Sequence, residues 1–195
     1  MNGAPVPPDR VRCFVAVDFP EEVRNDLRRL QQRLRARDLD LRWVQAESMH
    51  LTLKFLGEPD RKTFDAVAEA LSAPLEGFGA LRLEPRGLGA FPTPRRARVL
   101  WVGLAGDVAA LARLALTVES RMETVGIPRE GRAFAPHLTL GRARGPAGID
   151  GVDAALRAEE GYAGPPFTVT EIVLYESRLR PQGPQYIPRK TIPLS

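Results

Sequence analysis

The chain has 195 residues, enough for one domain with a hydrophobic core and too few for two large independent ones. Its 44% hydrophobic and 27% charged residues are typical of a soluble globular protein, and no apolar run approaches the roughly 20 residues of a membrane span. The net charge of +4 includes five arginines within residues 28–37 and three within residues 95–98, and such clusters favour an acidic partner such as RNA. The arginines of residues 28–37 are spread around a predicted helix, so we expect them to solvate its exposed face rather than to contact RNA directly.

Residues 1–10 contain three prolines and lack the basic start and apolar centre of a secretory signal. We expect a short disordered lead-in there, followed by one domain over residues 11–195. Cys13 is the single cysteine and lies in an apolar run, so a buried, inert thiol is expected. This favours a reducing, cytoplasmic setting.

The first half of the chain predicts a strand, a helix, two strands and a second helix. An apolar run before Pro20 predicts a buried strand, and an apolar stripe with helical spacing follows it up to about Arg37. Alternating apolar residues and turn signals then mark the next elements. The predicted ranges are 11–18, 21–37, 41–44, 49–56 and a helix around 64–71.

The second half repeats this plan. Strands are predicted at 98–104 and 137–142, with helices at 108–125 and 152–159. Strand residues at 78–91 are interrupted by proline and glycine, and 167–175 alternates like a strand. The last range, 186–194, contains two prolines and is therefore expected at a sheet edge.

This order predicts an α+β duplication with two lobes related by a pseudo-twofold axis. Each lobe is expected to be a mainly antiparallel sheet with helices outside it, and a cleft should lie where the lobes meet.

The sequence His-Leu-Thr-Leu occurs at residues 50–53 and again, letter for letter, at residues 137–140. His50 and His137 are the only two histidines in the chain. A single such motif is usually an ordinary half-exposed strand segment, but two copies at matching points of a repeated plan favour catalysis. Because side chains alternate along a strand, each histidine shares a face with Thr52 or Thr139 while the leucines point to the core.

Two imidazoles and two hydroxyls in one cleft suit phosphoryl transfer. Opening a cyclic phosphate requires a base for the attacking water and an acid for the departing sugar oxygen. Histidine serves both roles near neutral pH because its ordinary pKa is about 6.5. The threonine hydroxyls can donate hydrogen bonds to phosphate oxygens.

Other hydrolase classes lack their motifs here. A zinc site would need a third ligand with suitable spacing, and the chain has no H-E-x-x-H and no cysteine pair. No G-x-S-x-G occurs, and Cys13 is far in sequence from both histidine motifs. We therefore expect no metal and no cofactor.

Five blocks of sequence carry a resemblance to a known family, and together they span nearly the whole chain. They are RCFVAVD at 12–18, HLTLKFLG at 50–57, RVLWVGL at 98–104, FAPHLTLGR at 134–142 and LYESRL at 174–179. The chain resembles the two-histidine (2H) phosphoesterases, and among them the RNA 2′,3′-cyclic phosphodiesterases that are historically called 2′-5′ RNA ligases.

The resemblance implies that His50 is the general acid and His137 the base, so that the product is a 2′-phosphate. It also implies that Thr52 and Thr139 hold phosphate oxygens. Arg142, five residues after His137, resembles the family arginine that adds positive charge.

Phe55 stands in the equivalent place after His50 and resembles a residue that stacks a nucleobase, with a core position as the alternative. Strict alternation conflicts with these roles, because it puts Phe55 and Arg142 on the leucine faces unless the strands bulge or end.

Lys54 shares the face of His50 by alternation, so it either touches substrate phosphate or is a solvated strand lysine. Further arginines at 95–98, together with Arg129 and Arg132, either follow an RNA backbone or belong to exposed turns. Trp43 and Trp101 are expected in the core, given their apolar neighbours.

The expected substrate is RNA or an oligonucleotide with a 2′,3′-cyclic phosphate end, bound by a monomer without any membrane. Two alternatives remain open. One is a protein that only binds RNA ends, and the other is joining of a cyclic phosphate end to a 5′-hydroxyl in a 2′-5′ bond. Water is abundant, so hydrolysis is the predicted reaction.

Overall fold

A computed structural model describes residues 9–181 and 183–195. These residues form nine strands and four α-helices, together with two short 3₁₀ turns. The strands are β1 (Cys13–Val17), β2 (Leu41–Trp43), β3 (Leu51–Gly57), β4 (Leu81–Phe91), β5 (Val99–Gly106), β6 (Leu138–Ala143), β7 (Phe167–Val169), β8 (Glu171–Arg180) and β9 (Gly183–Pro193). The helices are α1 (Glu21–Arg35), α2 (Arg61–Ala70), α3 (Val108–Glu123) and α4 (Val152–Ala158).

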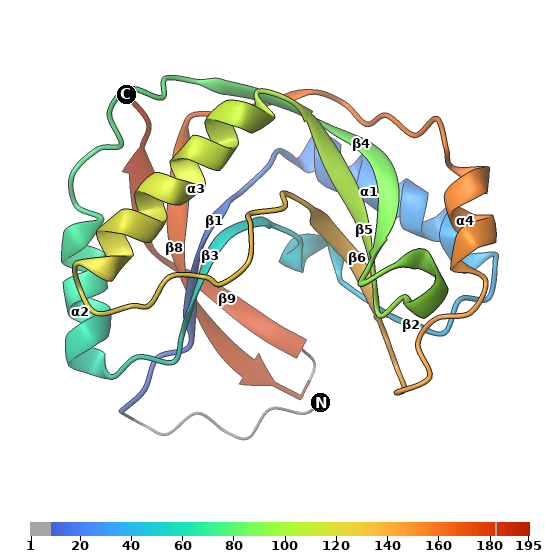
Figure 1. The fold of residues 1–195 in the computed structure, drawn as a ribbon, viewed down its shortest axis with the longest axis horizontal. Coiled ribbons are helices and arrows are strands. Elements are labelled where there is room, and N and C mark those ends of the chain that lie inside the picture. The colour runs from blue at the N-terminus through green and yellow to red at the C-terminus, as the bar shows by residue number, and fades with distance from the viewer. Residues whose placement is uncertain (1–8, 182) are drawn as a thin grey trace.

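The strands form two antiparallel sheets (Figure 1). The first has the order β3-β1-β8-β9 and the second the order β2-β6-β5-β4-β7. This confirms the predicted α+β architecture of two sheets with outer helices. The sheets do not divide the chain into its two halves, because β2 joins the second sheet and the C-terminal strands β8 and β9 complete the first.

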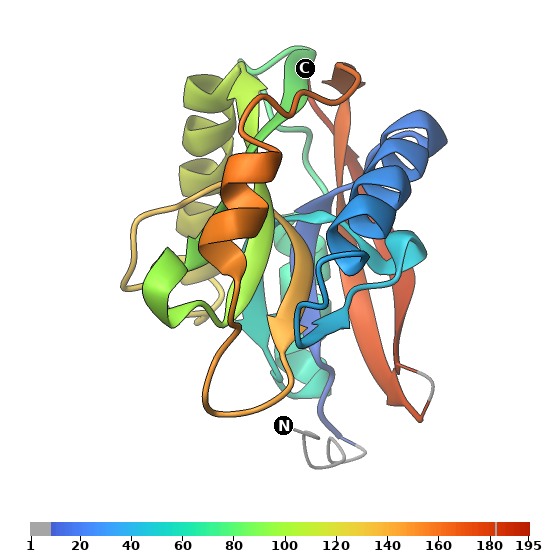
Figure 2. The same cartoon turned by 90° about the vertical axis from the view of Figure 1, so that its right-hand side faces the viewer.

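Each long helix packs against the sheet that it does not follow in the chain. Helix α1 follows β1 of the first sheet, yet Gln31 on α1 donates to the carbonyl of Leu140 in the second sheet at 2.9 Å. Helix α3 follows β5 of the second sheet, yet its Glu119 pairs with Lys54 of the first sheet at 2.7 Å. Helices α1 and α4 face the viewer in Figure 2, with α3 and α2 behind the sheets. The two lobes are therefore interlocked.

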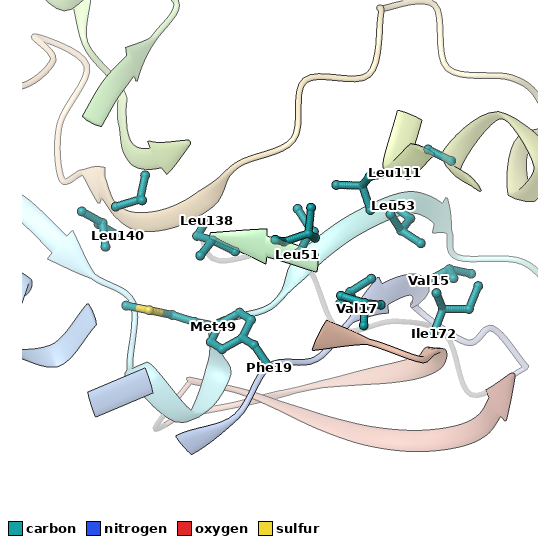
Figure 3. Packing of buried hydrophobic residues seen from close by; sticks show 14 of the residues in the cluster. Val15, Val17, Phe19, Met49, Leu51, Leu53, Leu111, Leu138, Leu140 and Ile172 are labelled. Atoms are coloured by element: carbon teal, nitrogen blue, oxygen red, sulfur yellow. The ribbon is translucent and has the colours of Figure 1, made fainter. Parts of the chain in front are cut away.

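The hydrophobic core runs without a break between the two sheets. The leucines of both His-Leu-Thr-Leu motifs are buried in it, as predicted. Figure 3 shows them beside Val15 and Val17 of β1 and Leu111 of α3. Burying the leucine face of each motif leaves the histidine and threonine face free to line a cavity.

Two strand predictions differ from the structure in instructive ways. Strand β4 continues through the predicted break, because Gly87 adopts a φ of +67° at a register shift between Arg86 and Leu88 and so absorbs the irregularity. The predicted strand 167–175 is split at Thr170 into β7 and β8, because the chain changes from the second sheet to the first there. Strand β9 lies at a sheet edge, as its prolines predicted.

Residues 1–8 of the predicted lead-in lie outside the described residues. The next two residues, Asp9 and Arg10, contact the start of α2. The Asp9 carbonyl accepts from the backbone N–H of Arg61 at 3.0 Å, and Arg10 forms a bridge with Asp60. The start of the chain that is described therefore packs beside α2.

Cys13 is buried in β1, as expected, and burial raises the pKa of its thiol to about 12. None of the helices in the described ranges is long and apolar enough to cross a membrane.

Candidate active site

The two histidines are held in the same way. Each lies one residue before its strand, since β3 begins at Leu51 and β6 at Leu138. Nδ1 of His50 lies 3.0 Å from the carbonyl oxygen of Ser48, and Nδ1 of His137 lies 2.7 Å from that of Ala135. A carbonyl can only accept, so Nδ1 carries a proton in both rings. Nε2 is then the nitrogen available to a substrate.

Aromatic rings fix both imidazoles from the neighbouring strands. Phe14 of β1 stacks on His50 with a centroid distance of 4.5 Å, and Tyr186 of β9 meets the same ring edge-on at 5.0 Å. Phe91 of β4 meets His137 edge-on at 5.0 Å.

Sequence reasoning missed these aromatic contacts, although one signal for them existed. Phe14 and Trp101 are 87 positions apart, which is also the separation of the two histidines. The ring centroids of Trp101 and His137 are 6.2 Å apart. Trp101 thus lies beside His137 as Phe14 lies beside His50, and Phe14 and Trp101 are equivalent positions of the duplication.

Burial shifts both histidines toward the neutral form. It lowers the pKa of His50 to about 4, with a further lowering from Arg24 and Arg142 and partial opposition from the Ser48 carbonyl and Asp18. Burial also lowers the pKa of His137, again helped by Arg142 and opposed by the Ala135 carbonyl. Both rings of the free protein are therefore neutral near pH 7.

A bulge in each motif strand places the residues beyond it. Leu53 is the extra residue of β3, because Val15 pairs with Lys54 while Ala16 pairs with Thr52. Leu140 is the extra residue of β6, because Leu100 pairs with Gly141 while Trp101 pairs with Thr139. An inserted residue reverses the alternation of the faces.

The two bulges therefore return Phe55 and Arg142 to the histidine and threonine faces. This resolves the conflict between their expected roles and strict alternation. Sequence alone could not locate the bulges, because they depend on pairing with distant strands.

Six of the seven predicted site residues line one cavity of about 720 Å³. They are His50, Thr52, Phe55, His137, Thr139 and Arg142. The cavity also contains residues that the sequence did not suggest, among them Arg12, Arg42, Trp43, Ser177 and Tyr186. Trp43 was expected in the core, and its half-buried ring in fact packs partly on the core and partly borders this cavity.

Lys54 is the exception: it is buried rather than solvated, and it lines the neighbouring second cavity instead of this one. The bulge at Leu53 turns it away from His50, and its side chain is only 1% exposed. Its ammonium group pairs with Glu119 of α3 at 2.7 Å and donates to the Pro128 carbonyl at 2.9 Å. Glu119 in turn accepts from the backbone N–H of Glu130 at 3.3 Å. Lys54 thus joins the first motif strand to the segment that leads into His137.

Replacing Lys54 with methionine should destabilise the protein by about 3–5 kcal/mol, because the Glu119 carboxylate is left buried without its cationic partner. Denaturant unfolding measures this loss. The double variant Lys54→Met/Glu119→Leu is the matched control and should recover most of it, since no buried charge remains. A single variant as stable as the wild type would show that the pair has no structural role.

A second cavity, of about 800 Å³, opens beside the first. The two share Thr52, Phe55, His137 and Arg142, whereas His50 borders only the first. Among the arginines that the sequence left undecided, Arg98, Arg129 and Arg132 line the second cavity, and Arg95 and Arg96 line neither.

Within residues 9–181 and 183–195, no group of three or more His, Cys, Asp or Glu side chains is placed to hold a metal ion.

Comparison with known proteins places this arrangement in a family. A protein of Methanothermobacter thermautotrophicus named RNA 2′,3′-cyclic phosphodiesterase is 31% identical over 177 residues, covering 91% of this chain and 95% of that protein. A protein of Aeropyrum pernix with the same name is 34% identical over 160 residues, covering 82% and 90%.

Solved structures agree with these sequence relatives. The crystal structure of Escherichia coli LigT complexed with 3′-AMP superposes with a TM-score of 0.74 at 26% identity, covering 95% of this chain and 99% of that one. The family model of LigT-like phosphoesterases matches twice, at residues 17–101 and 102–186, so each match contains one His-Leu-Thr-Leu motif. The chain therefore belongs to the LigT-like phosphoesterase family.

Proposed function

We propose that this protein hydrolyses the 2′,3′-cyclic phosphate ends of RNA to 2′-phosphates by two-histidine acid and base catalysis. The observation that carries the proposal is the pair of imidazoles in one cavity, each with Nδ1 tied to a backbone carbonyl and Nε2 available. Relatives named RNA 2′,3′-cyclic phosphodiesterase support the choice of substrate.

The reaction needs two proton transfers, one from the attacking water and one to the leaving 3′ oxygen. His137 takes a proton from water on Nε2, and the water oxygen attacks phosphorus as the bond to the 3′ oxygen breaks. His50 enters this step as the imidazolium, protonated on both nitrogens, and donates its Nε2 proton to that leaving oxygen. The product carries a 2′-phosphate and a free 3′-hydroxyl, and exchange with solvent restores both histidines.

The other cavity residues stabilise charge and hold the nucleoside. The Thr52 and Thr139 hydroxyls donate to the non-bridging phosphate oxygens, where negative charge grows in the transition state. Arg142 adds a positive charge beside them. Phe55 is 52% exposed and so offers a ring face on which a nucleobase can stack.

We also propose that the protein acts in RNA processing in the cytoplasm, as a monomer and without a metal. One chain supplies both histidines and both threonines, so no second copy is required to complete the cavity. The buried, unpaired Cys13 fits a reducing compartment.

Incubation with an oligonucleotide ending in a 2′,3′-cyclic phosphate tests the proposal. With EDTA present, the cyclic end should be converted to a 2′-phosphate, identified by phosphorus NMR. Inactivity that only a divalent metal relieves would contradict it, and so would release of a 3′-phosphate.

The pH dependence follows from the lowered pKa values. In the free protein both histidines have a pKa below the ordinary 6.5. The histidine that acts as acid therefore loses its proton as the pH rises through its lowered pKa. The profile of kcat/KM should be a bell with its maximum below pH 6.5, with limbs that belong to the coupled pair.

Binding of the phosphate anion stabilises an imidazolium, so the bell for kcat should lie at higher pH than the bell for kcat/KM. Steady-state kinetics between pH 4 and pH 9, roughly the range in which histidine titrates, measure both curves. A rate that rises continuously to high pH would instead indicate attack by hydroxide.

A further inference from the structure

An arginine of α1 holds the backbone turn that contains the hydrogen-bond acceptor of His50. Nη1 of Arg24 donates to the carbonyl oxygens of Ala46 and Met49, at 2.9 and 3.0 Å. The carbonyl of Ser48, which accepts from Nδ1 of His50, lies between these two in the sequence. Only 13% of the Arg24 side chain is exposed. Arg24 therefore restrains the acceptor by binding the carbonyls on both sides of it.

The turn before His50 is short and depends on such support. It is a single 3₁₀ segment, Ala46–Ser48, and 3₁₀ hydrogen bonds have poorer geometry than those of an α-helix. Helix α1, by contrast, has 15 residues, so Arg24 ties the turn to a longer and more rigid element. If the Ser48 carbonyl rotated, Nδ1 would lose its acceptor, and the ring would no longer be held in one tautomer and orientation.

Strand β1 fixes both the guanidinium group and the imidazole ring. Nη2 of Arg24 pairs with Asp18, the residue directly after β1. The hydroxyl of Tyr175 also donates to Asp18, at 3.3 Å. Phe14 of the same strand stacks on His50. The planar fork of the arginine thus spans the carbonyls and the carboxylate at once, which a single ammonium group cannot do.

The duplication does not repeat this pair in the second half. Helices α1 and α3 begin 87 positions apart, as the two histidines do. By this offset Arg24 corresponds to Leu111, whose side chain cannot donate a hydrogen bond. Asp18 corresponds to Ala105, whose side chain cannot accept one. The pair therefore belongs to the half of the chain that contains the proposed general acid.

We propose that Arg24 is a positioning residue for the general acid. It keeps the Ser48 carbonyl in place and so directs the Nε2 proton of His50 toward the leaving 3′ oxygen. This role rests on the proposed function and on His50 being the acid. Burial has the largest effect on the pKa of His50, and the charges of Asp18 and Arg24 shift it in opposite directions. The contribution of Arg24 is therefore one of geometry.

Arg24→Gln tests this role with two substrates. On an oligonucleotide with a 2′,3′-cyclic phosphate end, kcat should fall roughly tenfold or more, because a misdirected acid transfers its proton poorly. On a phosphodiester with a nitrophenolate leaving group, which departs without a proton, the rate should stay within about twofold of wild type. A merely structural role would lower both rates by the same factor, since unfolded protein is inactive on either substrate.

Arg28→Gln is the matched control. Arg28 lies one turn further along α1 and contacts the same 3₁₀ segment, but through the Glu47 side chain, at 2.7 Å, rather than through backbone carbonyls. Both rates should stay within about twofold of wild type, because exposed ion pairs contribute little.

Arg24→Lys separates geometry from charge. It keeps the positive charge but loses the fork, so kcat on the cyclic end should stay below that of the wild type. In the His50→Ala background, Arg24→Gln should cause no further loss, because its effect passes through the missing ring.

Four results would overturn the role of Arg24. They are an equal loss on both substrates, no loss on either, full activity of Arg24→Lys, and the same loss with and without His50. Failure of the wild type to hydrolyse the cyclic end would instead overturn the proposed function itself, so the two failures are distinguishable.

Discussion

Replacing either histidine with alanine should lower kcat/KM for a 2′,3′-cyclic phosphate by at least about 10²-fold, because each change removes one of the two proton-transfer groups. His50→Ala removes the imidazole that Phe14 and Tyr186 surround, and His137→Ala removes the one beside Phe91. The remaining ring cannot act as base on the attacking water and as acid on the leaving oxygen, because these lie on opposite sides of the phosphorus atom.

The double variant provides the control for this interpretation. Groups that act as a unit are not additive, so His50→Ala/His137→Ala should be scarcely slower than the slower single variant. Circular dichroism and binding of a nucleoside 2′-phosphate should be close to wild type in all three. A near-normal rate in either single variant would remove that histidine from the mechanism.

Thr52→Val and Thr139→Val should have the next largest effect, a fall in kcat of up to about 10²- to 10³-fold. Both threonines line the cavity with the histidines, and the charge on the phosphate oxygens that we propose they contact grows in the transition state. Valine keeps the β-branched shape, so the strands should remain intact.

Kinetics and unfolding together check this prediction. Thr→Ser at each position is the matched control, because it keeps the hydroxyl and removes only a methyl group, and it should retain most of kcat. If both valine variants keep the wild-type kcat, the threonines are structural and Arg142 alone holds the phosphate.

The sequence predicted the features that are determined by the local pattern of residues. Repetition of His-Leu-Thr-Leu pointed to a duplicated site, and alternation correctly placed its leucines in the core. The helical stripes predicted α1 and α3 to within two residues of their observed ends. These features are set by neighbours along the chain, so a single sequence contains them.

The sequence could not predict what depends on distant pairing. The bulges at Leu53 and Leu140 come from register against β1 and β5, and they decide that Phe55 enters the cavity while Lys54 is buried. Strict alternation gave the opposite result for both. Likewise, the contact of Tyr186 with His50 requires β9 to return to the first sheet from the far end of the chain.

A phosphodiester with a nitrophenolate leaving group tests most directly that one histidine is the general acid and the other the general base. Nitrophenolate departs without a proton, so the general acid becomes unnecessary while the base is still required. His50→Ala should therefore approach the wild-type rate on this substrate, and His137→Ala should stay slow. Rescue of both variants to the same extent, or of neither, would contradict the two-histidine account.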